Sequence, residues 1–234
     1  MLKLMYGVVR TENQDSFYLP DEDDKIKLYM IADGMGGHRG GKEASDLAIN
    51  SVEKYIKENF NAENIMSIIK EAIIYADKEI QKKAKSNAEL DGMGTTIDVA
   101  LIYNNRVYIG HVGDSRIYRV RKHIIRLLTK DHSYVEELID DGKITRDESY
   151  NHPEKNIITR ALGFMQDIEP DVCVKGFLKE DVLVLCTDGL TNMISIEEIK
   201  KEVTEHLEIA SDTLIKKANK NGGFDNITLV IVKN

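Results

Sequence analysis

The segment IKLYMIADGMGGHRGGK, residues 26–42, joins an alternating apolar run to an aspartate and a glycine-rich turn. Alternate side chains such as Leu28 and Met30 fall on one face of the run, which predicts a mostly buried β-strand. Asp33 ends this strand, and a helical pattern begins about eight residues later. A carboxylate fixed at a strand end, beside glycines that allow close approach of backbone and ligand, is a suitable place for a hard cation.

The composition is that of an ordinary globular protein and excludes several classes of function. The chain has 234 residues, enough for one large domain, and a net charge of -8, which argues against binding to nucleic acid or anionic membranes. No run approaches the roughly 18 apolar residues that a membrane span requires. Cys173 and Cys186 lie in or beside apolar runs and are expected to be buried free thiols. We therefore expect a cytoplasmic protein, and a monomer.

Periodicity divides the chain into helices and short strands. Helical spacing covers residues 44–56 and 65–80, with Asn61 as a candidate cap between them, and Ser195 opens a capping-box helix. A further helix is expected to begin at Ser211 or Asp212. A short helix is expected after Ser133, ending near Gly142 and turning Val135, Leu138 and Ile139 inward. Strands are predicted at residues 6–9, 17–19, 26–32, 97–103, 106–112, 116–120, 123–128, 172–177, 181–187 and 227–232, with a hairpin turn at Asn104 and Asn105.

The order of these elements predicts an α+β fold. Successive strands are joined by short turns, and the helices come in pairs rather than alternating with the strands, which favours antiparallel sheets with helices packed outside. We see no repeat or linker, so residues 1–234 are expected to form a single domain.

Aspartates next to glycines recur where strands begin or end. Four such neighbourhoods are Asp33-Gly34, Gly113-Asp114, Asp188-Gly189 and Gly223-Phe224-Asp225-Asn226, and Asp15 is a further candidate after the first strand. One Asp-Gly pair after a strand is usually only a turn. If several meet at one edge of the sheets, their like charges require cations. All-oxygen ligands suit Mg²⁺ or Mn²⁺ and suit Zn²⁺ poorly.

Seven blocks of the sequence carry a resemblance to a known family. They span essentially the whole chain and occur in the order seen in bacterial PP2C-type (PPM) metal-dependent Ser/Thr protein phosphatases. The blocks are RTENQDSF (10–17), ADGMGGH (32–38), GMGTT (92–96), HVGDSRIY (111–118), TRALG (159–163), CTDGL (186–190) and DNIT (225–228).

The resemblance implies a set of metal ligands. Asp33 would bridge two Mn²⁺ or Mg²⁺ ions, with the carbonyl of Gly34 on the second ion. Asp188 and Asp225 resemble the other ligands of the first ion. Asp114, together with Asp188, resembles the pair that holds a third, weaker ion in bacterial members.

Other site residues follow from the same resemblance. Arg10 resembles the family's phosphate-binding arginine, and a guanidinium fork suits two phosphate oxygens. Asp15 would orient metal-bound water, and Gln14 and Asn226 would support the site from behind the ligands. The implied catalytic residues are thus Arg10, Asp33 and His38.

Two positions depart from family patterns. Gln14 stands where many members have Glu, so a water-mediated contact to the second ion would be altered. Met35 stands where eukaryotic members carry a His that is proposed as the general acid. Bacterial relatives also have Met at this position. The leaving alkoxide would then be protonated by metal-bound water or by His38, for which a structural role is an equal alternative.

The resemblance also implies fold, mechanism and partners. The fold would be a four-layer αββα sandwich, with residues 133–157 as a mobile flap beside the active site. The reaction would be hydrolysis of phosphoserine and phosphothreonine in proteins by direct attack of a hydroxide bridging two metal ions, without a phosphoenzyme. The partners would be phosphoprotein substrates and a cognate bacterial Ser/Thr kinase.

Two other readings compete. Residues 36–42 spell G-x-x-x-x-G-K, close to a nucleotide-binding loop, but Glu43 follows where Ser or Thr would coordinate Mg²⁺. The second alternative is a non-catalytic binding module on the same fold, whose signature, loss of the metal aspartates, is missing here.

Overall fold

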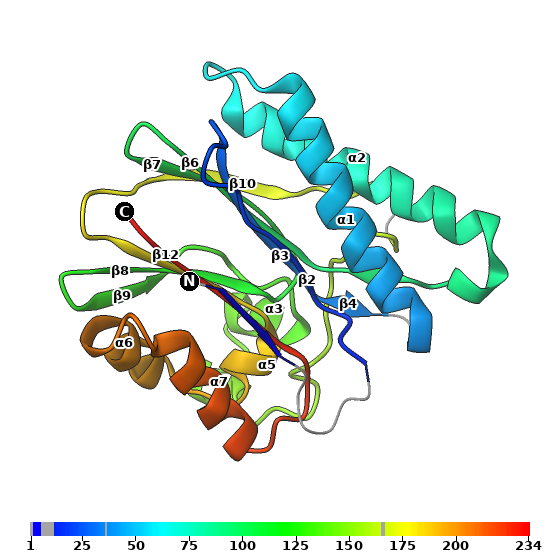
Figure 1. Ribbon diagram of the computed structural model, residues 1–234. Helices are drawn as coiled ribbons and strands as arrows, with labels where there is room; N and C mark the ends of the chain where they lie inside the picture. Colours follow the sequence, from blue (N-terminus) through cyan, green and yellow to red (C-terminus); the bar gives the residue numbers. More distant parts are fainter. Residues whose placement is uncertain (1, 6–11, 36, 165–166) are drawn as a thin grey trace.

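The protein folds as two antiparallel sheets packed face to face between helices (Figure 1). This computed structural model describes residues 2–5, 12–35, 37–164 and 167–234. The first sheet has the strand order β1 (Leu2–Met5), β12 (Ile227–Lys233), β11 (Val182–Cys186), β8 (Arg116–Arg121) and β9 (Ile124–Leu127).

The second sheet faces the first. Its strand order is β10 (Asp171–Gly176), β7 (Arg106–Val112), β6 (Ile97–Tyr103), β3 (Lys27–Ala32) and β2 (Ser16–Tyr18). Beside it lies a two-stranded ribbon of β4 (Gly34–Met35) and β5 (Gly94–Thr95). All the described strand pairs run antiparallel, and short connections join the consecutive pairs β2–β3, β6–β7 and β8–β9.

Helices cover the outer face of each sheet. The long pair α1 (Gly37–Asn59) and α2 (Ile65–Ser86) packs on the second sheet, and α6 (Ile196–Glu205) and α7 (Ala210–Lys220) pack on the first (Figure 1). Shorter helical turns are η1 (Ala88–Leu90), α3 (Tyr134–Asp140), α4 (Arg146–Ser149) and α5 (Asp188–Thr191). The α+β four-layer sandwich expected from the sequence is confirmed.

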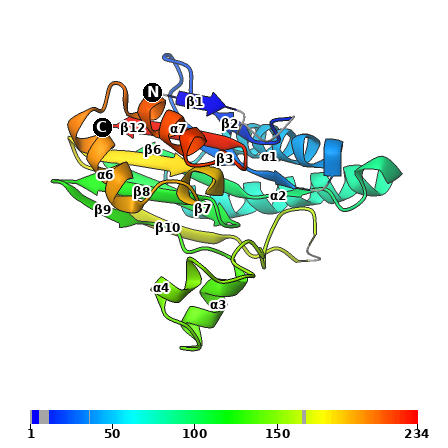
Figure 2. The same ribbon diagram turned by 90° about the horizontal axis from the view of Figure 1, so that it is seen from below.

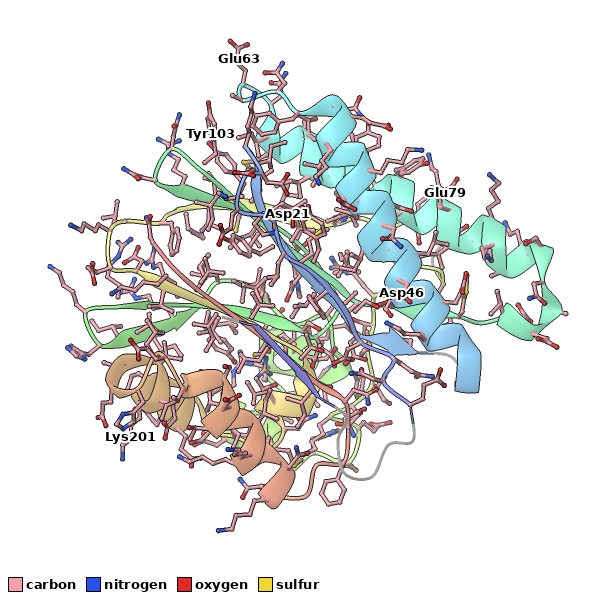
Figure 3. The ribbon with its side chains drawn as sticks, viewed as in Figure 1. Asp21, Asp46, Glu63, Glu79, Tyr103 and Lys201 are labelled. Carbon is pink, nitrogen blue, oxygen red and sulfur yellow. The ribbon has the colours of Figure 1, made fainter. Side chains whose placement is uncertain are left out.

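The apolar core follows these layers. Between the sheets, Ile31, Ile117 and Leu185 are among the buried side chains that pack together, and further clusters lie between each sheet and its helices. Charged side chains cover the outside of the sandwich: Lys201 on α6 and Glu63 in the turn before α2 both point outward into solvent (Figure 3). Buried strands in the middle hold the strand ends in place, and the candidate site lies at those ends.

The hairpin turn expected between β6 and β7 is confirmed. Asn104 and Asn105 both have positive φ, 47° and 57°, a left-handed conformation that asparagine tolerates well. The turn fixes the register of the two strands, which pairs Asp98 with His111.

Several local expectations are corrected. Asn61 does not cap α2: its side chain accepts a hydrogen bond from the Glu63 backbone in the preceding turn, and Asn64 occupies the cap position. The helix expected from Ser211 or Asp212 begins at Ala210. Cys186 is buried as expected, but Cys173 is only half-buried; both are free. The strand expected at residues 6–9 lies outside the described residues.

The expected flap, residues 133–157, projects from the sandwich and carries α3 and α4 (Figure 2). Ser133 caps α3 as expected, but Val135, Leu138 and Ile139 are only half-buried, whereas Glu136 is buried against Arg146 on α4. The charged part of the segment therefore has secondary structure of its own. Its mobility stays a prediction.

Within the described ranges, no helix combines the length and apolar character needed to cross a membrane.

Candidate functional site

Strand pairing brings Asp15 and Asp33 to the same edge of the second sheet. Ser16, which begins β2, pairs with Ala32, which ends β3. Asp15, which precedes β2, and Asp33, which follows β3, therefore lie side by side.

The first sheet supplies the remaining aspartates. Cys186 at the end of β11 pairs with Leu229 near the start of β12 and with Arg116 at the start of β8. Asp188 follows β11, Asp225 precedes β12, and Asp114 precedes β8. All three thus lie at one edge, facing the Asp33 end of the other sheet.

A pocket of about 1100 Å³ opens between these edges. Seven of the predicted site residues line it: Gln14, Asp33, Gly34, Asp114, Asp188, Asp225 and Asn226. Asp15 lies behind the pocket wall and is buried. We call Asp15, Asp33, Asp114, Asp188 and Asp225 the carboxylate cluster.

Two glycines allow the backbone to come close at this edge. A Cβ on Gly34 would lie 2.0 Å from the carbonyl oxygen of Gly41 on α1, and one on Gly189 would lie 1.9 Å from the carbonyl oxygen of Asn226. Neither distance is compatible with a side chain, so both Asp-Gly pairs need their glycine.

The backbone of Asp33 is held from both sides. Its N–H donates to Oγ1 of Thr96 at 2.9 Å, and its carbonyl accepts from Oγ1 of Thr95 at 2.9 Å. Asp188 is oriented by Asn192, whose side-chain amide donates to Oδ2 at 3.0 Å. The carboxylates are thus positioned by short threonine and asparagine contacts.

Asp15 joins the two sheets. Its Oδ2 accepts hydrogen bonds from Thr187 at 3.1 Å and Thr228 at 2.6 Å, both on the first sheet. Its buried Oδ1 takes no hydrogen bond from the described residues. Burial raises the pKa of Asp15 to about 7. The two threonine hydrogen bonds oppose this rise, and the charges of Asp188 and Asp225 add to it.

Asn226 fixes the segment that precedes Asp15. Its amide nitrogen donates to the carbonyl of Glu12 at 3.0 Å, and its Oδ1 accepts from the backbone N–H of Gln14 at 2.9 Å. A single side chain thereby holds residues 12–14 against the start of β12.

Electrostatic repulsion dominates the carboxylate cluster. Burial raises the pKa of Asp33 well above its usual value, and Asp15, Asp188, Asp114 and Asp225 raise it further. Burial, followed by the charge of Asp188, likewise raises the pKa of Asp114. Such groups need protons or cations to stay together.

These residues fit a hard divalent cation. The donors are carboxylate and carbonyl oxygens, and the buried Oδ1 of Asp15 has acceptor capacity that bound water could use. In the described part of the chain, no three His, Cys, Asp or Glu side chains are already arranged to hold one ion. The described residues of the pocket therefore supply oxygen donors for such a cation rather than a preformed set of three acidic or histidine ligands.

Two predicted catalytic residues are not placed. Arg10 lies outside the described residues. His38 lies in the first turn of α1, but its side chain is not among those described.

The nucleotide-loop reading is wrong. Residues 37–42 belong to α1 and form no loop. The ammonium of Lys42 is engaged within the fold, where it donates to the carbonyl of Asp15, to Ser16 and to Asp46. It is therefore not available to bind a triphosphate.

A second group of polar residues adjoins Asp114, and three of its members, Asp98, His111 and His132, are buried. We call Asp98, His111, His132, Arg160 and Asp171 the histidine cluster. Both ring nitrogens of His111 face acceptors, Asp98 Oδ1 at 2.6 Å and the Lys130 carbonyl at 2.9 Å. Burial lowers the pKa of His111, but these acceptors outweigh it and the pKa is raised.

His132 has the opposite character. Its Nδ1 accepts from the backbone N–H of Gly113 at 3.1 Å, and its Nε2 lies 3.3 Å from Asp171, which also pairs with Arg160 at 3.4 Å. Burial lowers the pKa of His132 to about 4, and nearby His111 and Arg160 add to the effect. The two histidines support loops, since His111 holds the carbonyl of Lys130 and His132 holds the N–H of Gly113.

Sequence reasoning missed several residues around the site. Thr187, Thr228 and Asn192 hold the carboxylates, and Phe164 and Phe224 line the pocket beside Lys155 and Arg160. Thr187 and Thr228 lie at the ends of predicted strands, so the face of the sheet toward which each side chain points could have been inferred from the alternation. Their contact with Asp15 depends on how the sheets pack.

The fold and the oxygen-rich pocket indicate a metal-dependent hydrolase. Residues 9–220 match the family described as protein phosphatase 2C. The chain is 41% identical over 233 residues to the serine/threonine phosphatase stp of Listeria monocytogenes, covering 97% of this chain and 92% of the relative.

Solved structures agree. The serine/threonine phosphatase PstP/Ppp of Mycobacterium tuberculosis superposes with a TM-score of 0.92 at 32% identity, covering 100% of this chain and 97% of that one. The structure of the catalytic domain of PstP in complex with two manganese ions superposes with a TM-score of 0.88 at 31% identity, covering 100% of this chain and 96% of that one. The chain belongs to the protein phosphatase 2C family and is an enzyme of the protein-serine/threonine phosphatase class.

Proposed function

We propose that the protein hydrolyses phosphoserine and phosphothreonine in proteins by direct attack of a hydroxide that bridges two Mn²⁺ or Mg²⁺ ions. The observation that carries this proposal is the gathering of Asp33, Asp188 and Asp225 on one pocket from three strand ends of two sheets. A related structure that contains two manganese ions supports the choice of metal.

The ions would lower the pKa of water and neutralise the phosphoryl group. The chain's own residues would hold these ions and orient the water. Asp33 would hold both ions with the Gly34 carbonyl beside it, and Asp188 and Asp225 would hold the first ion. Asp114 is the candidate for a third position together with Asp188, whose charge adds to burial in raising the pKa of Asp114.

Residues behind the ligands set the geometry. Asp15 keeps one oxygen on two threonine hydroxyls and the other free of hydrogen bonds from the described residues, so it can accept from a water in the pocket. Asn226 fixes the segment that bears Gln14. Arg10, whose position is not described, is proposed from the resemblance alone to bind the phosphate.

The proposal also covers the domain organisation, partners and location of the protein. We expect a single catalytic domain, residues 1–234, with residues 133–157 as a mobile flap beside the pocket. Phosphoproteins are the substrates, a Ser/Thr kinase supplies them, and the enzyme acts as a monomer in the cytoplasm. Two free cysteines and the net charge of -8 support this setting.

The test is phosphate release from a phosphothreonine peptide with and without Mn²⁺. We expect metal-dependent release that Asp188→Asn reduces at least about 1000-fold, because the variant loses a charged ligand at the reacting centre. Asp23→Asn, in the exposed turn before β3, is the matched control and keeps wild-type activity. ATP, offered as an alternative substrate, stays intact. No release with any divalent metal would leave the binding-module reading.

A further inference from the structure

Two exposed phenylalanines line the same pocket as the carboxylates. Phe164 has 53% of its surface exposed and Phe224 has 62%. Phenylalanine is normally buried, and an exposed ring at the rim of a pocket is a common feature of recognition sites. The phosphatase chemistry itself uses neither ring, so their position asks for a separate explanation.

The segment that carries Phe164 is held firmly. Leu162 exchanges two backbone hydrogen bonds with Thr95 on β5, and the N–H of Gly163 donates to Asp77 of α2 at 2.8 Å. The ring lies over Gly94, where a Cβ would come within 2.2 Å of a ring carbon. The ring is therefore fixed against the ribbon that begins at the metal site.

Phe224 is placed by the end of α7. The N–H of Gly223 donates to the carbonyl of Ala218 at 3.2 Å, which closes the helix, and the ring covers Gly222, where a Cβ would lie 2.5 Å from a ring carbon. The next residue is the candidate ligand Asp225. The ring thus stands immediately beside the reacting centre.

The two rings come from opposite halves of the sandwich. Phe164 comes two residues after Leu162, which pairs with Thr95 of β5 on the side of α2, whereas Phe224 lies in the connection between α7 and β12 on the other side. The carboxylates lie between these halves. A peptide whose phosphorylated side chain reaches the carboxylates therefore passes one ring on each side.

We propose that Phe164 and Phe224 select substrates by contact with apolar side chains that flank the phosphorylated residue, one ring on the N-terminal side and the other on the C-terminal side. This inference rests on the proposed function. The occupant is a phosphoserine or phosphothreonine peptide whose phosphate meets the polar floor and whose neighbours meet the rings. Met193 and Ile158, which also line the pocket, extend the apolar walls.

The experiment uses three phosphothreonine peptides of equal length. One has glycines on both sides, one has two leucines before the phosphothreonine, and one has two leucines after it. For wild type with Mn²⁺, kcat/KM for each leucine peptide is expected to exceed that for the glycine peptide about tenfold. Phe164→Ala reduces that ratio to near one for one leucine peptide, and Phe224→Ala does so for the other.

A ratio measured on a single enzyme preparation does not change when a variant merely folds less well. The matched control is Ile209→Ala, an equally exposed apolar residue at the opposite end of α7, which keeps the wild-type ratios. Equal hydrolysis of all three peptides by wild type, or wild-type ratios in both phenylalanine variants, would overturn the inference alone. Absence of release from every peptide would overturn the proposed function itself.

Discussion

The carboxylate cluster and the histidine cluster meet at Gly113 and Asp114, yet their charges are arranged in opposite ways. In the histidine cluster every charge faces a partner: His111 lies between Asp98 and a carbonyl, and Asp171 lies between His132 and Arg160. In the carboxylate cluster, neighbouring negative charges add to the effect of burial and raise the pKa values of Asp15, Asp33 and Asp114. A self-compensated cluster holds a fold together, whereas an uncompensated one needs a ligand.

Removing a charge should therefore have opposite effects on the two clusters. Loss of a partner from the histidine cluster leaves an uncompensated buried group. Loss of one carboxylate from the other cluster relieves repulsion in the absence of metal, but destroys the site.

Asp98→Asn should lower the free energy of unfolding by about 3–5 kcal/mol, because it leaves the buried His111 without its counter-charge. Urea denaturation measures the change. Asp171→Asn is the control: it belongs to the same cluster but is half exposed, and should cost less than about 1 kcal/mol. Equal, small losses in both variants would show that the histidine cluster contributes little to stability.

His132 should make stability depend on pH. In the unfolded chain a histidine binds a proton below a pH of about 6.5. In the folded protein burial lowers the pKa of His132 to about 4, among His111, Arg160 and Asp171. The unfolded state thus binds more protons between these pH values, and stability is lost as pH falls through this window.

His132→Gln cannot titrate, so this loss should disappear in the variant. As the pH falls from 7 to 4, the unfolding free energy of wild type should therefore decrease by on the order of 2 kcal/mol more than that of the variant. Parallel pH profiles for the two proteins would contradict the assignment of a neutral, buried His132.

Asp33→Asn should stabilise the protein when metal is chelated. The change removes one of several charges that repel one another, and about 1–2 kcal/mol of added unfolding free energy at pH 7.5 is expected. Asp23→Asn, on an exposed turn, should change nothing. Destabilisation by Asp33→Asn would mean that the carboxylates are compensated in a way that the geometry does not show.

Gln14→Glu should tighten the binding of Mn²⁺ about threefold, since it adds a carboxylate to the lining of the pocket. Isothermal titration calorimetry measures the affinity. Gln14→Leu, which adds no charge, serves as the control. Weaker binding in the glutamate variant would show that this position does not face the metal.

Much of the fold could be predicted from local pattern. Alternation marked the buried strands, and aspartates at their ends marked the pocket, because a strand end is fixed by the core behind it. The capping box at Ser195 gave the start of α6 correctly, since its contacts span only three residues. These features depend on neighbours in sequence.

The remaining features depend on packing between distant segments. Asp98 reads as one polar residue in an apolar strand, and its partner His111 appears only when the Asn104–Asn105 turn sets the register. Asp15 is joined to Thr187 and Thr228 across the two sheets. Phe164 and Phe224 became candidates only when both were seen on one pocket.

The proposed hydrolysis depends above all on the binding of divalent metal by the carboxylate cluster. The most direct test is the Tm of chelator-treated protein as Mn²⁺ is added. Wild type should gain stability with concentration, by about 2.7 kcal/mol at one hundred times the Kd, while Asp188→Asn shows little change. A wild-type Tm that does not respond to Mn²⁺, or one that rises equally in the variant, would contradict metal binding by the cluster.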